Sequence, residues 1–302
     1  MNDPRPYDYA YTVERMNRLL KNYPSLHALT LGKSVFGRPI PCLRIGETTA
    51  PSVLYVAAHH GMEWITTGIL LTYLEDFCRL AGTERHVYGI RPSCIVKNRC
   101  LYFVPLLNPD GVDLQIHGIT DETPGRERLI FYNNGSTDFS RWQANARGVD
   151  LNHNYDAGFS VYKKLEREKG IYGGAPTRYS GEYPESEPET AALASFLREH
   201  KNVRMVLTLH TQGEEIYCSS GEQIPPSAAR IASLFGRMTG YKVARPEGMA
   251  AYGGLTDWFI RAFNRPAFTF ECGRGQNPLP QSQACDIYEA VREALFTAPL
   301  FV

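Results

Sequence analysis

Hydrophobic positions along the chain alternate between continuous apolar runs and segments with helical spacing. The continuous runs have the pattern of strands that are buried on both faces, and they cover residues 53–58, 101–107, 203–209 and 266–270. Apolar residues three and four apart predict helices at residues 10–22, 64–80, 187–200, 227–239 and 286–296. Two shorter strands are predicted within residues 27–47, around the turn signal Gly37-Arg38-Pro39.

Buried strands that alternate with helices predict an α/β fold. We expect a single domain over residues 1–302, with a twisted, mixed but mostly parallel central sheet and helices on both faces. Asn108-Pro109-Asp110-Gly111 predicts a turn after the second buried strand. Residues 121–183 are rich in Gly, Asn, Arg and Tyr and form too long a connection to be idle, so they are a candidate functional region.

Composition narrows the class of protein. The 32 basic residues equal the 32 acidic ones, so no basic excess favours nucleic acid or an anionic membrane surface as a partner. Seven cysteines without a CxxC pair favour reduced thiols over a disulfide framework. No apolar run approaches the roughly 18 residues of a membrane span, and the N-terminus lacks the apolar core of a signal peptide. We therefore expect a cytoplasmic protein; its oligomeric state is not indicated.

Polar side chains follow three of the predicted strands where each strand ends. The first strand runs into His59-His60-Gly61-Met62-Glu63, the third ends at His210, and the fourth ends at Glu271. Ligands of open α/β sheets bind at the carboxyl ends of the strands. Residues far apart in the sequence are therefore expected to meet at one edge of the sheet.

These residue types suit a catalytic zinc site. His60 and Glu63 are three residues apart at a predicted helix start, which places them on one face. With His210 they form the two-His, one-carboxylate set that holds one catalytic zinc ion, although residue types alone also allow another divalent ion. Glu271 can take a proton from a metal-bound water. Each residue alone has a simpler explanation as a hydrogen-bonded core or solvated side chain, and His59 is an alternative ligand to His60.

The segments around these residues resemble the metallocarboxypeptidase family. Residues 60–66 (HGMEWIT) look like its zinc-binding signature. Further matches follow in family order, at residues 108–111, 148–156, 207–210, 253–258 and 268–271. The resemblance spans about residues 50–275 and implies the carboxypeptidase fold, one zinc ion and peptide hydrolysis.

Two segments narrow the resemblance. Residues 271–280 (ECGRGQNPLP) and 142–148 (WQANARG) are similar to those of bacterial γ-D-glutamyl-meso-diaminopimelate peptidases. These enzymes cut the bond between D-Glu and diaminopimelate in the stem peptides of cell-wall peptidoglycan. The resemblance therefore implies a muropeptide substrate, and the absence of wall-binding repeats and of a signal peptide favours small imported or intracellular muropeptides over the intact wall.

Two residues of the matched region are expected to support the chemistry. Asp150 is the candidate for orienting a ligand histidine, because metal-bound imidazoles donate their other N–H to a carboxylate. Arg147 is the candidate for stabilising the oxyanion, because a cation acts strongly where negative charge develops. A turn aspartate and a solvated surface arginine are the alternatives.

The sequence departs from the family pattern in its substrate-binding residues. Where ordinary carboxypeptidases have Asn-Arg, and the arginine clamps the terminal carboxylate, this chain has Asn152-His153. A histidine donates fewer hydrogen bonds and is only partly charged near neutral pH. Arg274 is a candidate for the missing charge.

The specificity-pocket segment departs as well. Met249 stands where the family's substrate-capping tyrosine aligns, so Tyr252, three residues later, is a candidate substitute or else a core residue. Thr256, at the expected pocket base, is small and polar. It argues against a large apolar or strongly basic side chain as the sole determinant of specificity.

Three functions follow from these patterns. The first is a zinc peptidase that acts on γ-D-Glu–diaminopimelate stem peptides. The second is a carboxypeptidase that trims ordinary L-peptides, or an acyl-amino-acid hydrolase. The third is a binding module that has lost catalysis, against which the intact His60, Glu63, His210 and Glu271 argue.

Overall fold

The structure is a computed structural model, and it describes residues 5–219 and 224–302. Within these residues, eight strands form one sheet in the order β1-β2-β4-β3-β5-β8-β6-β7. The strands are β1 (His27–Lys33), β2 (Pro39–Gly46), β3 (Ser52–Ala57), β4 (Cys100–Val104), β5 (Val203–His210), β6 (Glu215–Tyr217), β7 (Lys242–Ala244) and β8 (Ala267–Glu271).

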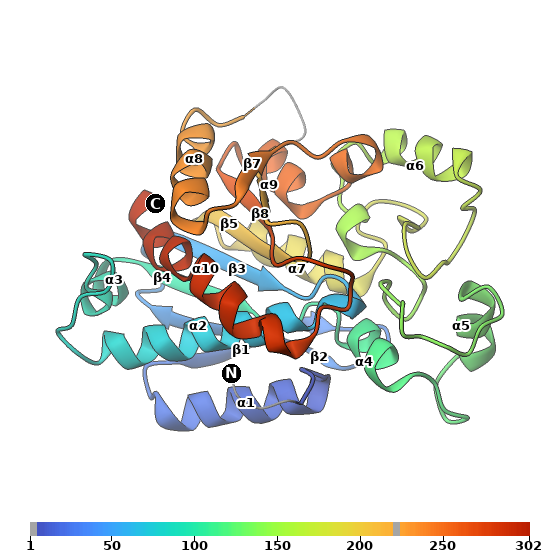
Figure 1. Ribbon diagram of the computed structural model, residues 1–302, viewed down its shortest axis with the longest axis horizontal. Helices are drawn as coiled ribbons and strands as arrows, with labels where there is room; N and C mark the ends of the chain where they lie inside the picture. Colours follow the sequence, from blue (N-terminus) through green and yellow to red (C-terminus); the bar gives the residue numbers. More distant parts are fainter. Residues whose placement is uncertain (1–4, 220–223) are drawn as a thin grey trace.

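Helices cover both faces of the sheet (Figure 1). The α-helices are α1 (Tyr9–Asn22), α2 (Ile65–Ala81), α3 (Pro92–Asn98), α4 (Pro109–His117), α5 (Arg126–Tyr132), α6 (Phe159–Glu168), α7 (Pro188–Glu199), α8 (Ala228–Thr239), α9 (Leu255–Phe263) and α10 (Ala284–Thr297). Short 3₁₀ helices are η1 (Gly61–Glu63), η2 (Leu151–His153), η3 (Gly248–Ala251), η4 (Gln281–Gln283) and η5 (Ala298–Phe301).

The continuous apolar runs feed two hydrophobic cores, one on each face of the sheet. In β3, Val53 and Tyr55 pack with α1, α2, α8 and α10, whereas Leu54 and Val56 pack with α7 and α9. Successive side chains of a strand point to opposite faces, so a strand between two helical layers must be apolar at every position. This arrangement confirms the predicted α/β fold with a mixed sheet.

The sheet directions bring three strand ends to one edge. Strand β3 is parallel to β4 and β5, and β5 is parallel to β8, whereas β2 and β6 pair antiparallel with their neighbours β4 and β8. The register pairs His210, the last residue of β5, with Glu271, the last residue of β8. Parallel strands therefore deliver their C-terminal residues to the same place.

The Asn108–Gly111 segment starts a helix and does not form an isolated turn. The Asn108 side chain accepts a hydrogen bond from the Gly111 N–H, and Pro109 is the first residue of α4. Asn at the N-cap and Pro at the first helical position are signals for a helix start as well as for a turn, and here the helix forms. The turn prediction was wrong in this respect.

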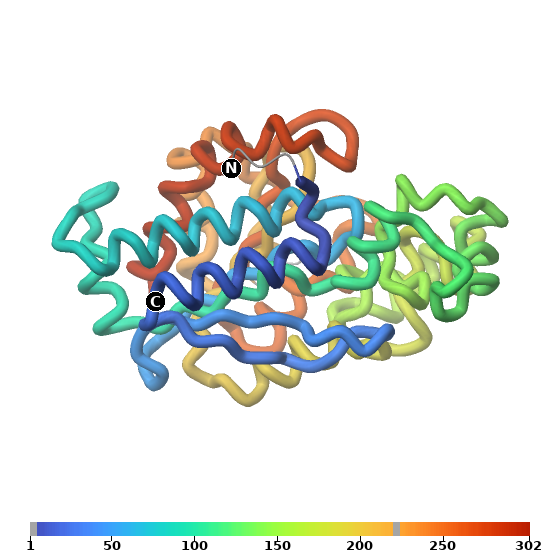
Figure 2. The backbone as a smooth tube through the Cα atoms, turned by 90° about the horizontal axis from the view of Figure 1, so that it is seen from below, coloured from blue at the N-terminus to red at the C-terminus, as the bar shows by residue number. Residues whose placement is uncertain are grey.

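The candidate functional region at residues 121–183 lies beside the carboxyl edge of the sheet. It contains α5, η2 and α6, joined by irregular chain, and the tube view shows it gathered at one end of the molecule (Figure 2). A small apolar cluster around Trp142 and Phe139 supports it. None of the helices in the described ranges has the length and apolar character needed to cross a membrane.

Candidate active site

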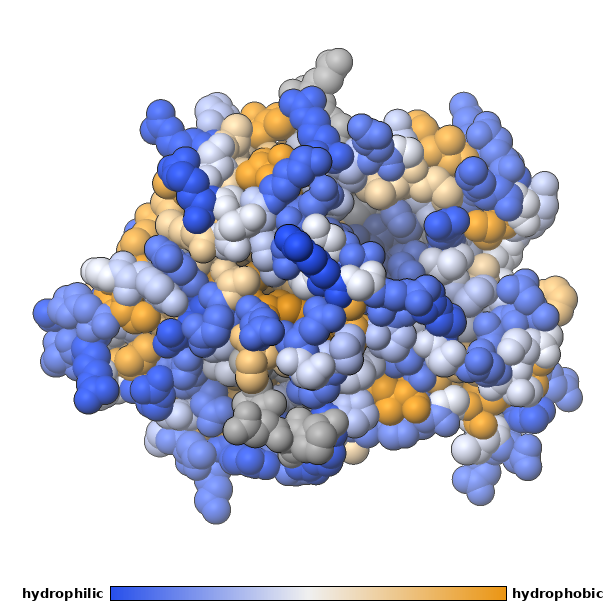
Figure 3. All heavy atoms as spheres, in the orientation of Figure 1, coloured by the Kyte–Doolittle hydropathy of each residue, from blue (hydrophilic) through white to orange (hydrophobic). Residues whose placement is uncertain are grey.

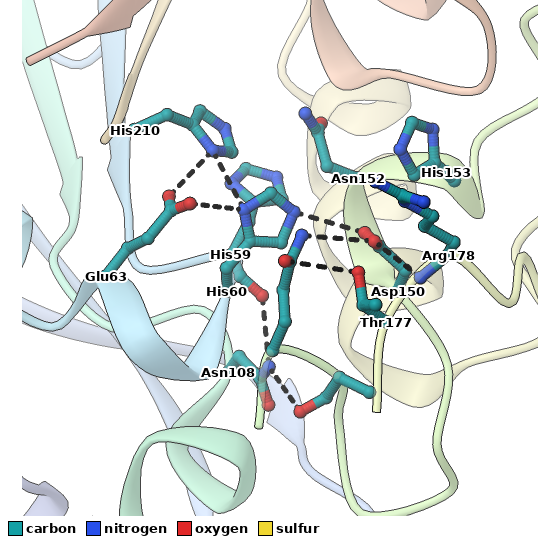
Figure 4. A network of polar contacts seen from close by, with 12 residues as sticks. His59, His60, Glu63, Asn108, Asp150, Asn152, His153, Thr177, Arg178 and His210 are labelled. Atoms are coloured by element: carbon teal, nitrogen blue, oxygen red, sulfur yellow. Dashed lines mark hydrogen bonds and ion pairs between the residues drawn. The ribbon is translucent and has the colours of Figure 1, made fainter. Parts of the chain in front are cut away.

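His60, Glu63 and His210 meet at the carboxyl edge of the sheet. His60 and Glu63 follow β3 through η1, and His210 ends β5. His60 Nδ1 lies 2.9 Å from Glu63 Oε1, His210 Nδ1 lies 3.0 Å from Glu63 Oε2, and the two Nδ1 atoms are 3.3 Å apart. All three side chains are buried, and Figure 4 shows them pointing toward one another. The predicted His-Glu-His cluster is thus brought together.

The spacing of these atoms fits one zinc ion. Two tetrahedral ligands about 2.0–2.1 Å from zinc lie about 3.3 Å apart, close to the observed separations. Burial alone would lower the pKa of His60, but the carboxylates of Glu63 and Asp150 raise it well above its ordinary value. The site therefore requires a positive charge, which a divalent cation supplies in place of a proton. These three residues form the metal-binding group found among the described residues.

Asp150 holds the imidazole of His60 from the other side. Its Oδ1 atom lies 3.1 Å from His60 Nε2, and its Oδ2 atom accepts hydrogen bonds from the Gln143 side chain and the Arg178 N–H, each at 3.1 Å. Burial opposes ionisation of Asp150, but the charges of His153 and His60 and these hydrogen bonds keep its pKa well below the usual range. This is the geometry expected of a carboxylate that orients a ligand histidine.

His59 is not part of the cluster. It is fully buried, with Nε2 at 3.2 Å from the Tyr155 hydroxyl and Nδ1 at 3.3 Å from Thr208 Oγ1. Burial, followed by the charges of His210 and His60, lowers its pKa well below the usual value. His59 is therefore a neutral core histidine, which decides between it and His60.

Glu271 stands next to the cluster without joining it. It pairs in register with His210 across β5 and β8, and its side chain lines a pocket together with His60. Burial, followed by the negative charge of Glu63, raises its pKa to about 8. A carboxylate held beside a metal site but outside the ligand set is placed to exchange protons there.

Two adjoining hollows open onto the cluster. The inner pocket, of about 120 Å³, is lined by His60, Asn152, His153, Tyr217, Ser219, Pro246, Ala250, Gly254, Thr256, Asp257, Thr269 and Glu271. The outer cleft, of about 1140 Å³, is lined by Met62, Asn133, Arg141, Gln143, Asp150, His153, Lys169, Pro176, Thr177, Arg178, Gln212, Glu247, Met249, Ala250, Gly275, Gln276 and Asn277. Figure 3 shows a hollow with largely hydrophilic walls on the face toward the viewer. His153 and Ala250 line both, so the two hollows adjoin each other.

Asn152, His153 and Thr256 lie on the inner pocket, as expected of substrate-binding residues. Asn152 Oδ1 accepts a hydrogen bond from the Leu255 N–H at 3.1 Å, and Thr256 Oγ1 lies 2.7 Å from Thr269 Oγ1. The His153 ring stacks on Tyr162, with ring centres 4.3 Å apart. Burial lowers the pKa of His153 below its ordinary value, against the opposing effect of the Asp150 carboxylate.

Three other expected site residues lie elsewhere. Arg147 is half exposed, pairs with Glu187 at 3.8 Å, and lines a separate hollow with Arg128 and Tyr132. Arg274 is exposed and ion-paired with Glu214. Neither residue lines the inner pocket or the outer cleft. The structure therefore does not place either guanidinium at the cluster, and the oxyanion role expected of Arg147 and the substrate-binding role expected of Arg274 stay predictions.

Tyr252 also differs from the expectation. Its ring packs against Gly158 at the start of α6, and only its carbonyl oxygen reaches the site, where it accepts a hydrogen bond from His153 Nδ1 at 2.7 Å. Met249, which is expected at the position of the family's capping tyrosine, lines the outer cleft. A capping role for the Tyr252 side chain is thus not supported.

Sequence reasoning missed the basic side chains that do line the cleft. Arg141, Lys169 and Arg178 all come from the candidate functional region. Gln143, which ties Asp150 to Thr177 through hydrogen bonds of 3.1 and 3.2 Å, was also missed. The one available signal was compositional, since residues 121–183 combine basic residues with turn-forming glycines.

Comparison with known proteins places the chain in a family. The profile of the family described as zinc carboxypeptidase matches residues 12–294. The chain belongs to the zinc carboxypeptidase family. The γ-D-glutamyl-L-diamino acid endopeptidase 1 of Lysinibacillus sphaericus is 35% identical to it over 302 residues, which are 100% of this chain and 74% of that protein.

Solved structures of the carboxypeptidase fold superpose on this chain. Thrombin-activatable fibrinolysis inhibitor superposes with a TM-score of 0.75 at 19% identity, over 99% of this chain and 75% of that one. The murein-tripeptide amidase of Escherichia coli O157 superposes with a TM-score of 0.53 at 20% identity, over 90% and 91% of the two chains. The family and its peptidase members establish the protein as a zinc metallopeptidase with a His-Glu-His candidate metal site.

Proposed function

We propose that this zinc metallopeptidase hydrolyses the bond between γ-linked D-Glu and meso-diaminopimelate in peptidoglycan stem peptides. The observation that carries the proposal is the polarity of the inner pocket. Its walls include the buried residues Ser219, Thr256, Asp257 and Thr269, and no Lys or Arg is among the described residues that line it. Hydroxyls and a carboxylate in the wall suit an amino group on the bound side chain better than they suit an apolar side chain.

The comparisons support the same substrate class. The relative that is 35% identical is named for cleavage at a diamino acid, and diaminopimelate is a diamino acid. The seven cysteines are free thiols, five of them buried, which fits the reducing cytoplasm and thus small intracellular muropeptides as substrates.

We assign the chemical roles as follows. His60, Glu63 and His210 hold zinc, and Asp150 fixes the tautomer and orientation of His60. Zinc, when bound, supplies a Lewis acid for the scissile carbonyl and lowers the pKa of a water molecule. The Glu271 carboxylate accepts the proton of the attacking water and returns it to the nitrogen of the leaving amine. Asn152 and Thr256 contact the leaving diamino acid from the walls of the inner pocket.

The decisive experiment measures release of meso-diaminopimelate from L-Ala-γ-D-Glu-meso-diaminopimelate by mass spectrometry. Zinc-loaded protein should release it, a chelator should stop the release, and added zinc should restore it. Glu271→Gln should lower kcat by about 10²–10⁴ with zinc content unchanged. Glu214→Gln is the matched control, because Glu214 pairs with Arg274 outside both hollows.

Ordinary C-terminal L-peptides provide the competing outcome. An enzyme that trims N-acyl dipeptides but leaves the stem peptide intact would be a general carboxypeptidase, and the proposed substrate would be wrong. Full activity of Glu271→Gln on every substrate would instead remove the assigned proton-transfer role.

A further inference from the structure

The outer cleft carries more positive than negative charge next to the metal cluster. Among the described residues that line it, Arg141, Lys169 and Arg178 are basic, and Glu247 is the exposed acid opposing them. Asp150 also lines it but is buried and bonded to His60. Arg141 is partly engaged, because its Nη1 donates to the Asn277 carbonyl at 2.7 Å. The cleft therefore suits an anionic group on the substrate.

His153 cannot bind that anionic group in the way an arginine does. Its Nδ1 faces the Tyr252 carbonyl at 2.7 Å, and a carbonyl only accepts, so Nδ1 carries the proton. In the neutral imidazole the other nitrogen, Nε2, is then an acceptor. An acceptor repels a carboxylate. The charge that the family's arginine supplies at this position must come from another residue.

Hydrogen bonds to Asp150 and Tyr162 fix the backbone of Arg178 beside His153 and the metal cluster. Its φ angle is +66°, in the left-handed region that non-glycine residues rarely adopt. The conformation is held from both sides, because the Arg178 N–H donates to Asp150 Oδ2 at 3.1 Å and its carbonyl accepts from the Tyr162 hydroxyl at 3.0 Å. Asp150 also holds His60, and Tyr162 also stacks on His153.

The side chain of Arg178 is available to a ligand. It is exposed and lines the outer cleft with His153, and no ion pair of the described residues involves its guanidinium. In Figure 4, Arg178 lies beside Asp150, on the side of Asn152 and His153. A guanidinium in this position presents paired N–H donors that match the two oxygens of a carboxylate.

We propose that Arg178 binds the carboxylate of the substrate residue on the C-terminal side of the scissile bond, and so replaces the arginine that His153 displaces. In the stem peptide this group is the carboxylate at the L-centre of diaminopimelate. The identity of that residue rests on the proposed function, whereas the carboxylate clamp does not. The clamp predicts a preference for substrates whose carboxylate on this residue is free.

The test compares Arg178→Gln and Arg178→Lys with wild type on two substrates. One is L-Ala-γ-D-Glu-meso-diaminopimelate, and the other is the same tripeptide with the L-centre carboxylate converted to a carboxamide. Arg128→Gln is the matched control, because it removes an exposed arginine that lines a separate hollow. Zinc content and thermal unfolding confirm that each variant is folded and loaded.

Arg178→Gln should lower kcat/KM on the free acid by roughly tenfold to a hundredfold, mainly through KM, because a charge-assisted pair is lost. On the carboxamide it should change kcat/KM by no more than about twofold. On the free acid, kcat/KM of Arg178→Lys should lie between the values of wild type and Arg178→Gln, because lysine keeps the charge but not the paired donors. Equal losses on both substrates, or no loss on either, would overturn the clamp.

Binding separates this proposal from the proposed function. If wild type releases no diaminopimelate, the stem-peptide assignment fails, and the clamp is judged by calorimetry with meso-diaminopimelate and its L-centre monoamide. A wild-type preference for the free acid that Arg178→Gln abolishes supports the clamp. Equal binding of the two compounds by wild type, or a preference that survives in Arg178→Gln, contradicts it.

Discussion

Replacement of Asp150 by Asn isolates the contribution of the carboxylate behind the metal site. Asp150 is fully buried and faces donors from His60 Nε2, the Gln143 side chain and the Arg178 N–H, each at 3.1 Å. The amide keeps the shape but replaces one oxygen with an NH₂ group. Whichever way the amide is turned, a donor then faces another donor, and His60 loses its charged partner.

The magnitude follows from these contacts. A hydrogen bond to a charged group contributes about 1.5–3 kcal/mol, so we expect the unfolding free energy to fall by about 2–4 kcal/mol. With an unfolding entropy of about 2.1 cal/mol/K per residue over 302 residues, Tm should fall by about 3–6 °C. Loss of a carboxylate that orients a ligand histidine should weaken zinc binding about 10- to 100-fold.

The assay is a chelator competition for zinc, together with thermal unfolding in excess chelator, because bound zinc itself raises the apparent stability. Asp110→Asn is the matched control. Asp110 is equally buried and accepts hydrogen bonds from Ser34 Oγ at 2.9 Å and the Phe36 N–H at 2.8 Å. The Asp110→Asn substitution should therefore destabilise the fold without changing zinc affinity. Zinc affinity of Asp150→Asn within about threefold of wild type would refute the role given to Asp150.

Two further predictions concern stability. Gly61→Ala would place a Cβ 2.4 Å from the Gly111 carbonyl oxygen and 2.8 Å from that of Trp142, so we expect a loss of about 3 kcal/mol or more in urea unfolding. Gly173→Ala, whose Cβ would meet nothing within 4 Å, should cost nothing, and equal stabilities of the two variants would contradict the packing argument. Burial raises the pKa of Glu189 from its ordinary 4.5 to about 8, so the folded protein holds an extra proton between these values and the unfolding free energy should fall as pH rises through that window. Glu189→Gln should flatten the pH profile there, and an unchanged slope would show that Glu189 does not titrate as expected.

The sheet could be predicted where burial dictates composition. The run expected at 53–58 is strand β3 (Ser52–Ala57), because a strand between two helical layers is apolar throughout. Strands β6 (Glu215–Tyr217) and β7 (Lys242–Ala244) were not predicted, because three residues are too few to show the alternation of apolar and polar positions that indicates a strand. Helix α6 was also missed, because its buried face includes the charged Glu166, which bonds to Lys163 and Ser180.

The metal cluster could be predicted, and the basic side chains that line the outer cleft could not. His60 and His210 directly follow or end buried strands, so the sheet topology alone brings them together. Arg147 and Arg274 were chosen for their nearness in sequence to matched motifs, but loop side chains have no period that gives their direction. Arg178 reaches the cleft through backbone hydrogen bonds to Asp150 and Tyr162, which are tertiary contacts that no local pattern reveals.

The separation of the ligand strands in the sequence has a consequence for folding during synthesis. His60 and His210 are 150 positions apart, so zinc has no complete set of ligands until residue 210 has left the ribosome and β5 has docked beside β3. This long loop must close before zinc binding to the full ligand set can stabilise the fold. Closure is slow because the contacting residues are far apart in the sequence. Unlike the site of a zinc finger, the complete three-ligand site here requires strands β3 and β5 to have paired. Zinc binding by all three ligands would therefore report that β5 has docked beside β3.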